Sequence, residues 1–227
     1  MLPFTKEHAQ AYDARFAKVE ALKESLHLLM RILLADLPEW ARILCVGVGT
    51  GAELLALAKA FPGFEFTAVE PSEAMLEICR KKAEEEGIAP RCSFFCGYIQ
   101  DLPAAEPFDV ATSLLVSQFI TQRVERVAFF EAVAQRLQPG GYLINVDLSA
   151  DLESERAVGL KEFWGKMQVY LGTPPEKAND YLEGWKGNVA VLPPEQVEEI
   201  ISAGGFGRPT LFYQNLFIHG WFARRIG

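Results

Sequence analysis

Short apolar runs alternate with longer amphipathic stretches through the first two thirds of the chain. The runs lack a helical period, and several are bounded by glycine or proline, as buried strands are. The expected strands lie at residues 43–46, 64–69, 92–96, 109–115 and 142–146. Helical patterns are expected at residues 52–60, 72–86 and 123–137. Strands that alternate with helices predict a doubly wound α/β fold with a mostly parallel sheet.

The N-terminal region predicts a helical cap. Residues 5–37 read as helical, and Leu22, Leu26, Leu29 and Leu33 form one apolar stripe before Pro38 ends the pattern. The region before this stripe is more polar and could form a separate short helix.

The alternation stops after the fifth expected strand. Residues 151–188 are polar and aromatic and predict an inserted helical lid containing four large rings, Trp164, Tyr170, Tyr181 and Trp185. A helix is expected after Pro193 and Pro194, followed by strands at 211–213 and 216–222 with the turn at residues 214–215. We therefore expect one domain in four parts: cap 1–39, core 40–147, lid 148–191, and a C-terminal helix and strands 192–227.

Three glycines at alternate positions follow the first expected strand. Gly47, Gly49 and Gly51 stand between that strand and a run of strong helix formers. Glycines allow a positive φ and let a ligand approach the backbone, and the free N–H groups of a following helix suit an anion. The alternative is a tight strand-to-helix turn that binds nothing.

Glu70 ends the second expected strand, beside this glycine turn. In doubly wound folds a carboxylate at this place accepts hydrogen bonds from a ribose. The spacing does not choose the cofactor, because the turn also satisfies the pattern for dinucleotides.

Composition and charge narrow the function classes. The 227 residues are 50% hydrophobic and carry a net charge of −8, so nothing favours nucleic-acid binding. No stretch has the length of a membrane span or the apolar core of a signal peptide, and we expect a cytoplasmic protein. The four cysteines and three histidines show no metal-ligand spacing, so no metal is expected. Cys92 and Cys96 share a strand about 13 Å apart, too far for a disulfide.

Four motifs resemble, in order, those of class I methyltransferases that use S-adenosylmethionine (SAM). They read "ILCVGVGTG", "AVEPSEAML", "GYIQDLP" and "RLQPGGYLI", and lie within residues 40–147. The two C-terminal strands also resemble that family's seven-stranded sheet, in which the C-terminal strand runs antiparallel. The resemblance implies SAM as the cofactor.

The resemblance also assigns site residues. The three glycines would line the methionine end of SAM, Glu70 would hold the ribose hydroxyls, and the end of the fourth strand would border the sulfonium. The implied cofactor-binding residues are Gly47, Gly49, Gly51, Glu70, Pro71, Met75, Tyr98, Ile99, Leu114 and Tyr12. No catalytic residue is assigned; residues that could face the acceptor are Tyr12, Asp13, Ser117, Gln118, Lys161, Tyr170 and Tyr181.

Two positions depart from that family. It usually has an acid where this chain has Cys45, which commonly orders the glycine loop, and another where it has Tyr98. A narrower, distant resemblance links several segments to carboxy-SAM synthases, which hold a carboxylated SAM with an arginine. The matching place here lies near Glu183, where Lys186 is the nearby cation.

The combined interpretation is a SAM-dependent methyltransferase that acts on a small-molecule acceptor, without nucleic acid or membrane partners. Three alternatives stay open: a carboxy-SAM-type transferase, a non-catalytic SAM-binding or partner-activating protein, and an NAD(P)-dependent oxidoreductase. The acceptor and the oligomeric state are not determined by the sequence.

Overall fold

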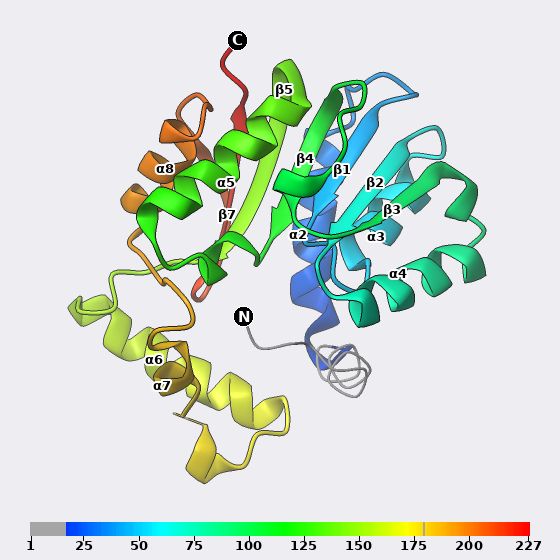
Figure 1. The fold of residues 1–227 in the computed structure, drawn as a ribbon. Coiled ribbons are helices and arrows are strands. Elements are labelled where there is room, and N and C mark those ends of the chain that lie inside the picture. The colour runs from blue at the N-terminus through cyan, green and yellow to red at the C-terminus, as the bar shows by residue number, and fades with distance from the viewer. Residues whose placement is uncertain (1–16, 179) are drawn as a thin grey trace.

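A seven-stranded sheet organises the molecule (Figure 1). The computed structural model describes residues 17–178 and 180–227. The strand order is β3-β2-β1-β4-β5-β7-β6, in which β1 to β5 pair in parallel and β7 runs antiparallel to both its neighbours. The strands are β1 (Arg42–Val46), β2 (Glu65–Glu70), β3 (Cys92–Cys96), β4 (Phe108–Leu114), β5 (Leu137–Leu148), β6 (Thr210–Asn215) and β7 (Ile218–Arg224). This topology confirms the expected Rossmann-like fold.

Helices cover both faces of the sheet, because the central strands β1, β2, β4 and β5 carry buried apolar side chains on both sides. They are α2 (Glu20–Leu33), α3 (Ala52–Ala60), α4 (Glu73–Glu85), α5 (Arg123–Arg136), α6 (Glu155–Tyr170), α7 (Asp180–Trp185) and α8 (Pro194–Ala203). Short 3₁₀ turns lie at Ala17–Val19, Ala89–Arg91, Ile99–Asp101, Ser117–Phe119 and Pro175–Lys177. One core lies between the sheet and α2, α3 and α4, and a second between the sheet and α5 and α8.

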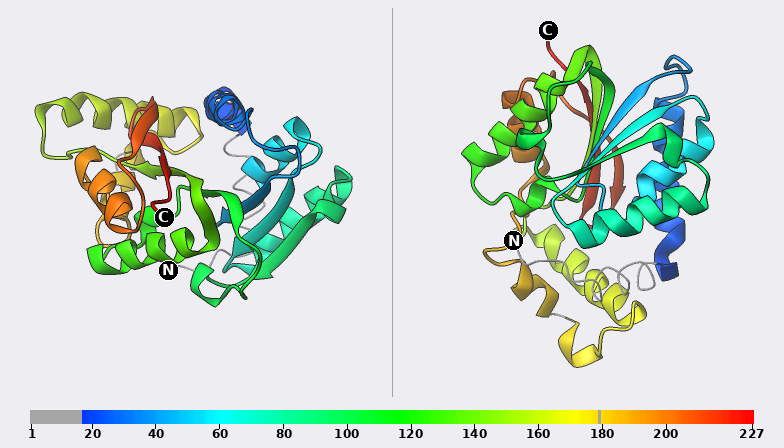
Figure 2. Two further views of the ribbon diagram at one scale, coloured as in Figure 1. Left: turned by 90° about the horizontal axis from the view of Figure 1, so that it is seen from above. Right: turned by 45° about the vertical axis from the view of Figure 1, so that its right-hand side comes forward.

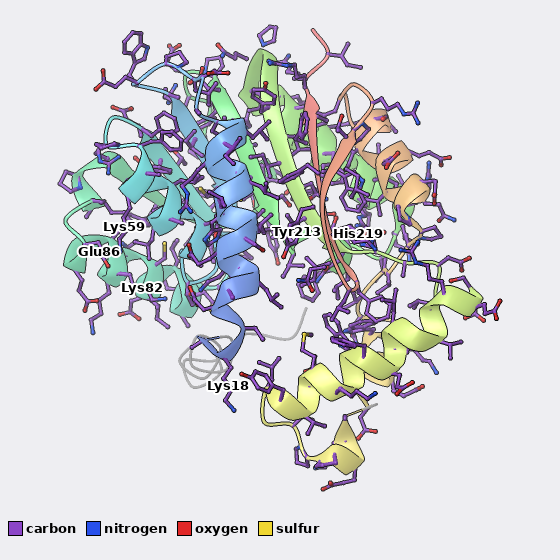
Figure 3. All side chains as sticks on the ribbon, turned by 180° about the vertical axis from the view of Figure 1, so that it is seen from behind. Lys18, Lys59, Lys82, Glu86, Tyr213 and His219 are labelled. Carbon is purple, nitrogen blue, oxygen red and sulfur yellow. The ribbon has the colours of Figure 1, made fainter. Side chains whose placement is uncertain are left out.

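Local sequence signals explain several boundaries. Ser72 is the N-cap of α4, and its hydroxyl accepts a hydrogen bond from the Met75 N–H at 3.4 Å. Leu26 on α2 is buried against the sheet, as its apolar stripe predicts, whereas Leu28 and Ile32 face outward. Lys59 of α3 and Glu86, just after α4, form an ion pair at 2.8 Å on the outer side of these helices (Figure 3).

Two boundaries differ from the sequence predictions. The prediction of a turn at residues 214–215 is wrong: both residues belong to β6, and the chain turns at Leu216 and Phe217. Phe217 is fully buried beneath the lid, so tertiary packing outweighs the turn preference of Asn215. β5 begins at Leu137 instead of 142, with a register irregularity between Phe108 and Val110 on its partner β4.

The lid leaves and re-enters the sheet at neighbouring points. It contains α6 and α7, which lie beyond the edge of the sheet at which β5 ends (Figures 1 and 2). The Ser149 hydroxyl and the Ala150 N–H both donate to the Leu192 carbonyl, at 2.8 and 3.0 Å. The start and end of the insertion are thus fastened together, while the limits 148 and 191 stay predictions.

Candidate functional site

The glycine turn between β1 and α3 has the backbone conformation that its sequence predicts. Gly47, Gly49 and Gly51 have φ values of +68°, +55° and +86°, which side chains other than glycine rarely adopt. The N–H groups of Gly47 and Val48 donate to the Val69 carbonyl at 2.7 and 3.1 Å. The turn is therefore held directly against the C-terminal end of β2.

The three glycines serve two different purposes. A Cβ on Gly47 would lie 2.5 Å from Val116 Cγ2, and one on Gly51 would lie 2.6 Å from Cys79 Sγ. A Cβ on Gly49 would meet no described atom within 4 Å. Gly47 and Gly51 thus permit close packing, whereas Gly49 leaves the backbone approachable by a ligand.

Glu70 connects β2 to this turn. Its Oε2 accepts a hydrogen bond from the Gly49 N–H at 3.0 Å, and its Oε1 accepts one from the Ser72 N–H at 2.9 Å. Burial of the carboxyl raises its pKa, while the two backbone N–H groups oppose that change. The carboxyl therefore lies beside the most open part of the glycine turn.

A second buried acid, Glu53, was not singled out by sequence reasoning. It lies in the first turn of α3 and is 5% exposed. Burial raises its pKa to about 8, and the nearby Glu70 carboxylate acts in the same direction. Burial also raises the pKa of Cys45, with Glu53 as the next cause. Glu53, on α3, thus lies near Cys45 on β1. Its position two residues after Gly51 was the sequence signal by which it could have been found.

The other residues implied for the cofactor follow β2 and β3. Met75, on the first turn of α4, is buried, and Pro71 before it is half-buried. Ile99 is buried against the α5 side, whereas Tyr98 is 53% exposed. Tyr12 and Asp13 lie outside the described residues. These assignments stay predictions.

The end of β4 lies against the glycine turn. Leu114 is the last residue of the strand, and Leu115 has a φ of +60°, which is strained for a branched side chain. The Leu115 N–H donates to the Val146 carbonyl at 2.6 Å. Val116 then packs against Gly47, so this segment borders the glycine turn. That it borders the sulfonium of SAM stays a prediction.

The residues suggested for the acceptor do not converge. Ser117 and Gln118 are buried in a polar network with Asp147 and Arg126, two residues that sequence reasoning missed. Lys161 donates to the Leu152 carbonyl at 2.7 Å within the lid. Tyr170 is 65% exposed, and Tyr181 is placed only as part of α7.

Two of the lid rings, Trp164 and Trp185, pack on each other and on Phe217 of the turn between β6 and β7. Trp164, Trp185 and Phe217 make mutual edge contacts, with ring centroids 5.4 to 5.7 Å apart. The same cluster contacts Leu115, beside the glycine turn. At the other end of α6, Lys18 donates to the Tyr170 carbonyl at 3.4 Å and links the lid to the start of the cap helix (Figure 3).

The fold is Rossmann-like, and a glycine turn of this kind is typical of nucleotide-binding proteins of that class. An approachable glycine backbone and a strand-ending carboxylate suit a cofactor with a ribose and a charged amino-acid end. Within the described residues, no group of three histidine, cysteine or acidic side chains could hold a metal ion. In that part of the chain, no helix is long and apolar enough to cross a membrane.

Comparison with known proteins finds a methyltransferase domain in the core of the chain. A family model described as a methyltransferase domain matches residues 43–141. This match covers less than half of the chain, and together with the fold it makes the chain similar to class I SAM-dependent methyltransferases. The family and the fold imply SAM as the methyl donor.

The chain spans about half or less of the length of the curated relatives it matches. A malonyl-[acyl-carrier protein] O-methyltransferase of Priestia megaterium is 31% identical over 138 residues, which cover 60% of this chain and 47% of the relative. A carboxy-S-adenosyl-L-methionine synthase of Campylobacter hominis is 34% identical over 85 residues, covering 37% of this chain and 36% of that protein.

Similarity to solved structures covers more of the chain than these sequence matches do. An O-methyltransferase family protein of Burkholderia thailandensis superimposes with a TM-score of 0.64 at 16% identity, covering 99% of this chain and 64% of that chain. At this identity the likeness concerns the fold alone.

Proposed function

We propose that this protein transfers a methyl group from SAM to a small-molecule acceptor. The observation that carries the proposal is the contact of Glu70 with the Gly49 N–H, beside space that no described atom fills. The carboxylate can accept hydrogen bonds from ribose hydroxyls, and the open turn leaves room for the amino-acid end of the cofactor. The remaining cofactor residues are proposed on the family resemblance.

Positioning accounts for the proposed chemistry. Bound SAM supplies an activated methyl group. Gly49 and Glu70 would hold the cofactor beside the end of β4, and the lid would exclude water from the site. A base is needed only for an acceptor that must lose a proton. A carboxylate acceptor is already ionised at neutral pH and needs none.

The named relatives suggest the first acceptors to assay. Several are malonyl-[acyl-carrier protein] O-methyltransferases, and the malonyl group ends in a free carboxylate. We therefore propose a carboxylate oxygen as the first methylation site to examine, on a free acid or on an acyl thioester.

Charge pairing disfavours carboxy-SAM chemistry. Lys186, the cation near the matching position, is paired with Glu183 at 2.7 Å. Arg126 reaches the nearby Ala190 carbonyl, but its guanidinium is paired with Asp147 at 2.9 Å. A further carboxylate here would therefore meet an exposed lysine and a buried arginine that each already have a carboxylate partner.

Calorimetry and a transfer assay test the function. We expect the purified protein to bind SAM and S-adenosylhomocysteine, but not NAD or NADP. It should move a labelled methyl group from SAM to malonyl-CoA, malonyl-acyl-carrier protein or another acid in a panel. Binding of NAD or NADP without either sulfur nucleotide would refute the proposal. SAM binding with no transfer across the panel would favour the non-catalytic alternative, and carboxy-SAM formed from SAM and prephenate would favour the synthase.

A further inference from the structure

Asp147, at the end of β5, is the centre of a buried polar network. The residue is fully buried, and its Oδ2 accepts hydrogen bonds from Arg126 Nη2 at 2.9 Å, Ser117 Oγ at 2.6 Å and Asn145 Nδ2 at 2.6 Å. Its Oδ1 accepts one from the Gln118 N–H at 3.0 Å. One carboxylate thus gathers donors from β5, from α5 and from the loop after β4.

Arg126 extends the network to the lid. Its guanidinium is 1% exposed, and Nε donates to Ser117 Oγ at 3.0 Å while Nη1 donates to the Ala190 carbonyl at 3.3 Å. Ala190 in turn donates its N–H to the Gln118 carbonyl at 2.8 Å. The segment by which the lid returns to the sheet is therefore tied to the loop after β4 from both sides.

Stability alone does not explain such a network. A buried ion pair loses much of its Coulombic gain to desolvation, and apolar replacements of similar volume are often equally stable. Buried polar networks instead specify one arrangement of the groups they join. The groups joined here all lie at the sheet edge where the glycine turn lies.

The network continues without a gap to the glycine turn. Asp147 holds Ser117 and Gln118 by hydrogen bonds. The two residues before them are Leu115, whose backbone is strained, and Val116. The Val116 side chain occupies the space that a Cβ on Gly47 would need. A shift of the loop after β4 would therefore move the Val116 side chain that packs against the glycine turn.

We propose that Arg126 and Asp147 are positioning residues for the cofactor site. Together they fix residues 115–118 against the glycine turn, and they connect the lid's return segment to the same loop. The inference rests on the proposed function only in taking the glycine turn as the place where S-adenosylhomocysteine binds.

Calorimetry with S-adenosylhomocysteine, alongside thermal unfolding, tests the inference. Arg126→Gln removes the positive charge and the forked guanidinium. A misplacement of about 1 Å caused by a remote mutation can cost an enzyme up to roughly a hundredfold in rate. We expect the Kd of Arg126→Gln to rise by at least about tenfold, and Arg126→Lys to recover part of the loss because it keeps the charge. The matched control is Arg136→Gln on the same helix, where Arg136 is outside this network and donates to the Pro103 carbonyl at 2.7 Å. Its Kd should stay within about twofold of the wild type, well below the tenfold that corresponds to 1.4 kcal/mol.

Methyl NMR separates positioning from general destabilisation. In protein labelled at the Leu and Val methyl groups, Arg126→Gln should shift the Leu115 and Val116 signals and alter their response to S-adenosylhomocysteine. Arg136→Gln should leave both unchanged. If Arg126→Gln does not fold, Ser117→Ala, which removes the hydroxyl between the two charges, and Arg126→Lys take its place.

The outcomes are distinguishable. A lower melting temperature with unchanged Kd and unchanged Val116 signals in these variants would overturn the positioning role. Failure of the wild-type protein to bind S-adenosylhomocysteine would instead refute the proposed function. A weakened Kd in Arg126→Gln that matches an equal loss in Arg136→Gln would also contradict the inference.

Discussion

Replacement of Glu53 by glutamine should make the protein more stable, and increasingly so as the pH rises. Glu53 is 5% exposed, and burial, reinforced by Glu70, raises its pKa from 4.5 to about 8. Between these values the folded protein keeps a proton that the unfolded chain releases. The stability that this proton contributes is complete below pH 4.5 and is lost as the pH rises through 8. Glutamine has a similar shape and does not titrate, so Glu53→Gln should escape this loss.

The magnitude follows from the two pKa values. At 1.36 kcal/mol for each pKa unit, the gap between 4.5 and about 8 corresponds to at most ~5 kcal/mol. Urea unfolding of both proteins between pH 4.5 and 9 should show Glu53→Gln gaining relative to the wild type, by up to that amount. Glu125→Gln, at an exposed first-turn position of α5, is the control. A difference between Glu53→Gln and wild type that varies by less than about 1 kcal/mol over this range would refute the reasoning.

Three further changes test the site and its support. Glu70→Ala removes the carboxylate that accepts from the Gly49 and Ser72 N–H groups and that is proposed to bind the ribose. It should weaken SAM binding about 10- to 150-fold by calorimetry, and unchanged affinity would show that the ribose lies elsewhere. Gly51→Ala puts a Cβ 2.6 Å from Cys79 Sγ and should cost roughly 1–3 kcal/mol in urea unfolding. Gly87→Ala, with φ +71° and no described atom within 4 Å of its Cβ, measures the backbone strain alone; equal losses in the two glycine variants would contradict the packing argument. Ser72→Ala removes the α4 N-cap and should cost about 0.5–2 kcal/mol in thermal unfolding, whereas no change would mean that the cap is replaced by water.

The sequence alone determined the framework of this protein. Apolar runs bounded by glycine and proline identified the strands, because a strand buried on both faces needs apolar residues without a helical period. The alternation of strand and helix then determined a parallel sheet, and Gly49 and Glu70 could be placed at the same edge because parallel strands end on the same side. These predictions depend on local pattern and on chirality, both of which are readable along the chain.

Only the tertiary structure decided which polar residues meet. Arg126 and Asp147 are 21 positions apart, and nothing in their local sequence distinguishes a buried ion pair from two exposed charges. Glu53 reads as an ordinary first-turn acid of a helix, yet the fold buries it beside Cys45. The C-terminal turn lies at Leu216 and Phe217 because the Phe217 ring is needed under Trp164. In each case burial and long-range packing outweigh the local preference, and neither quantity is encoded at a single position of the chain.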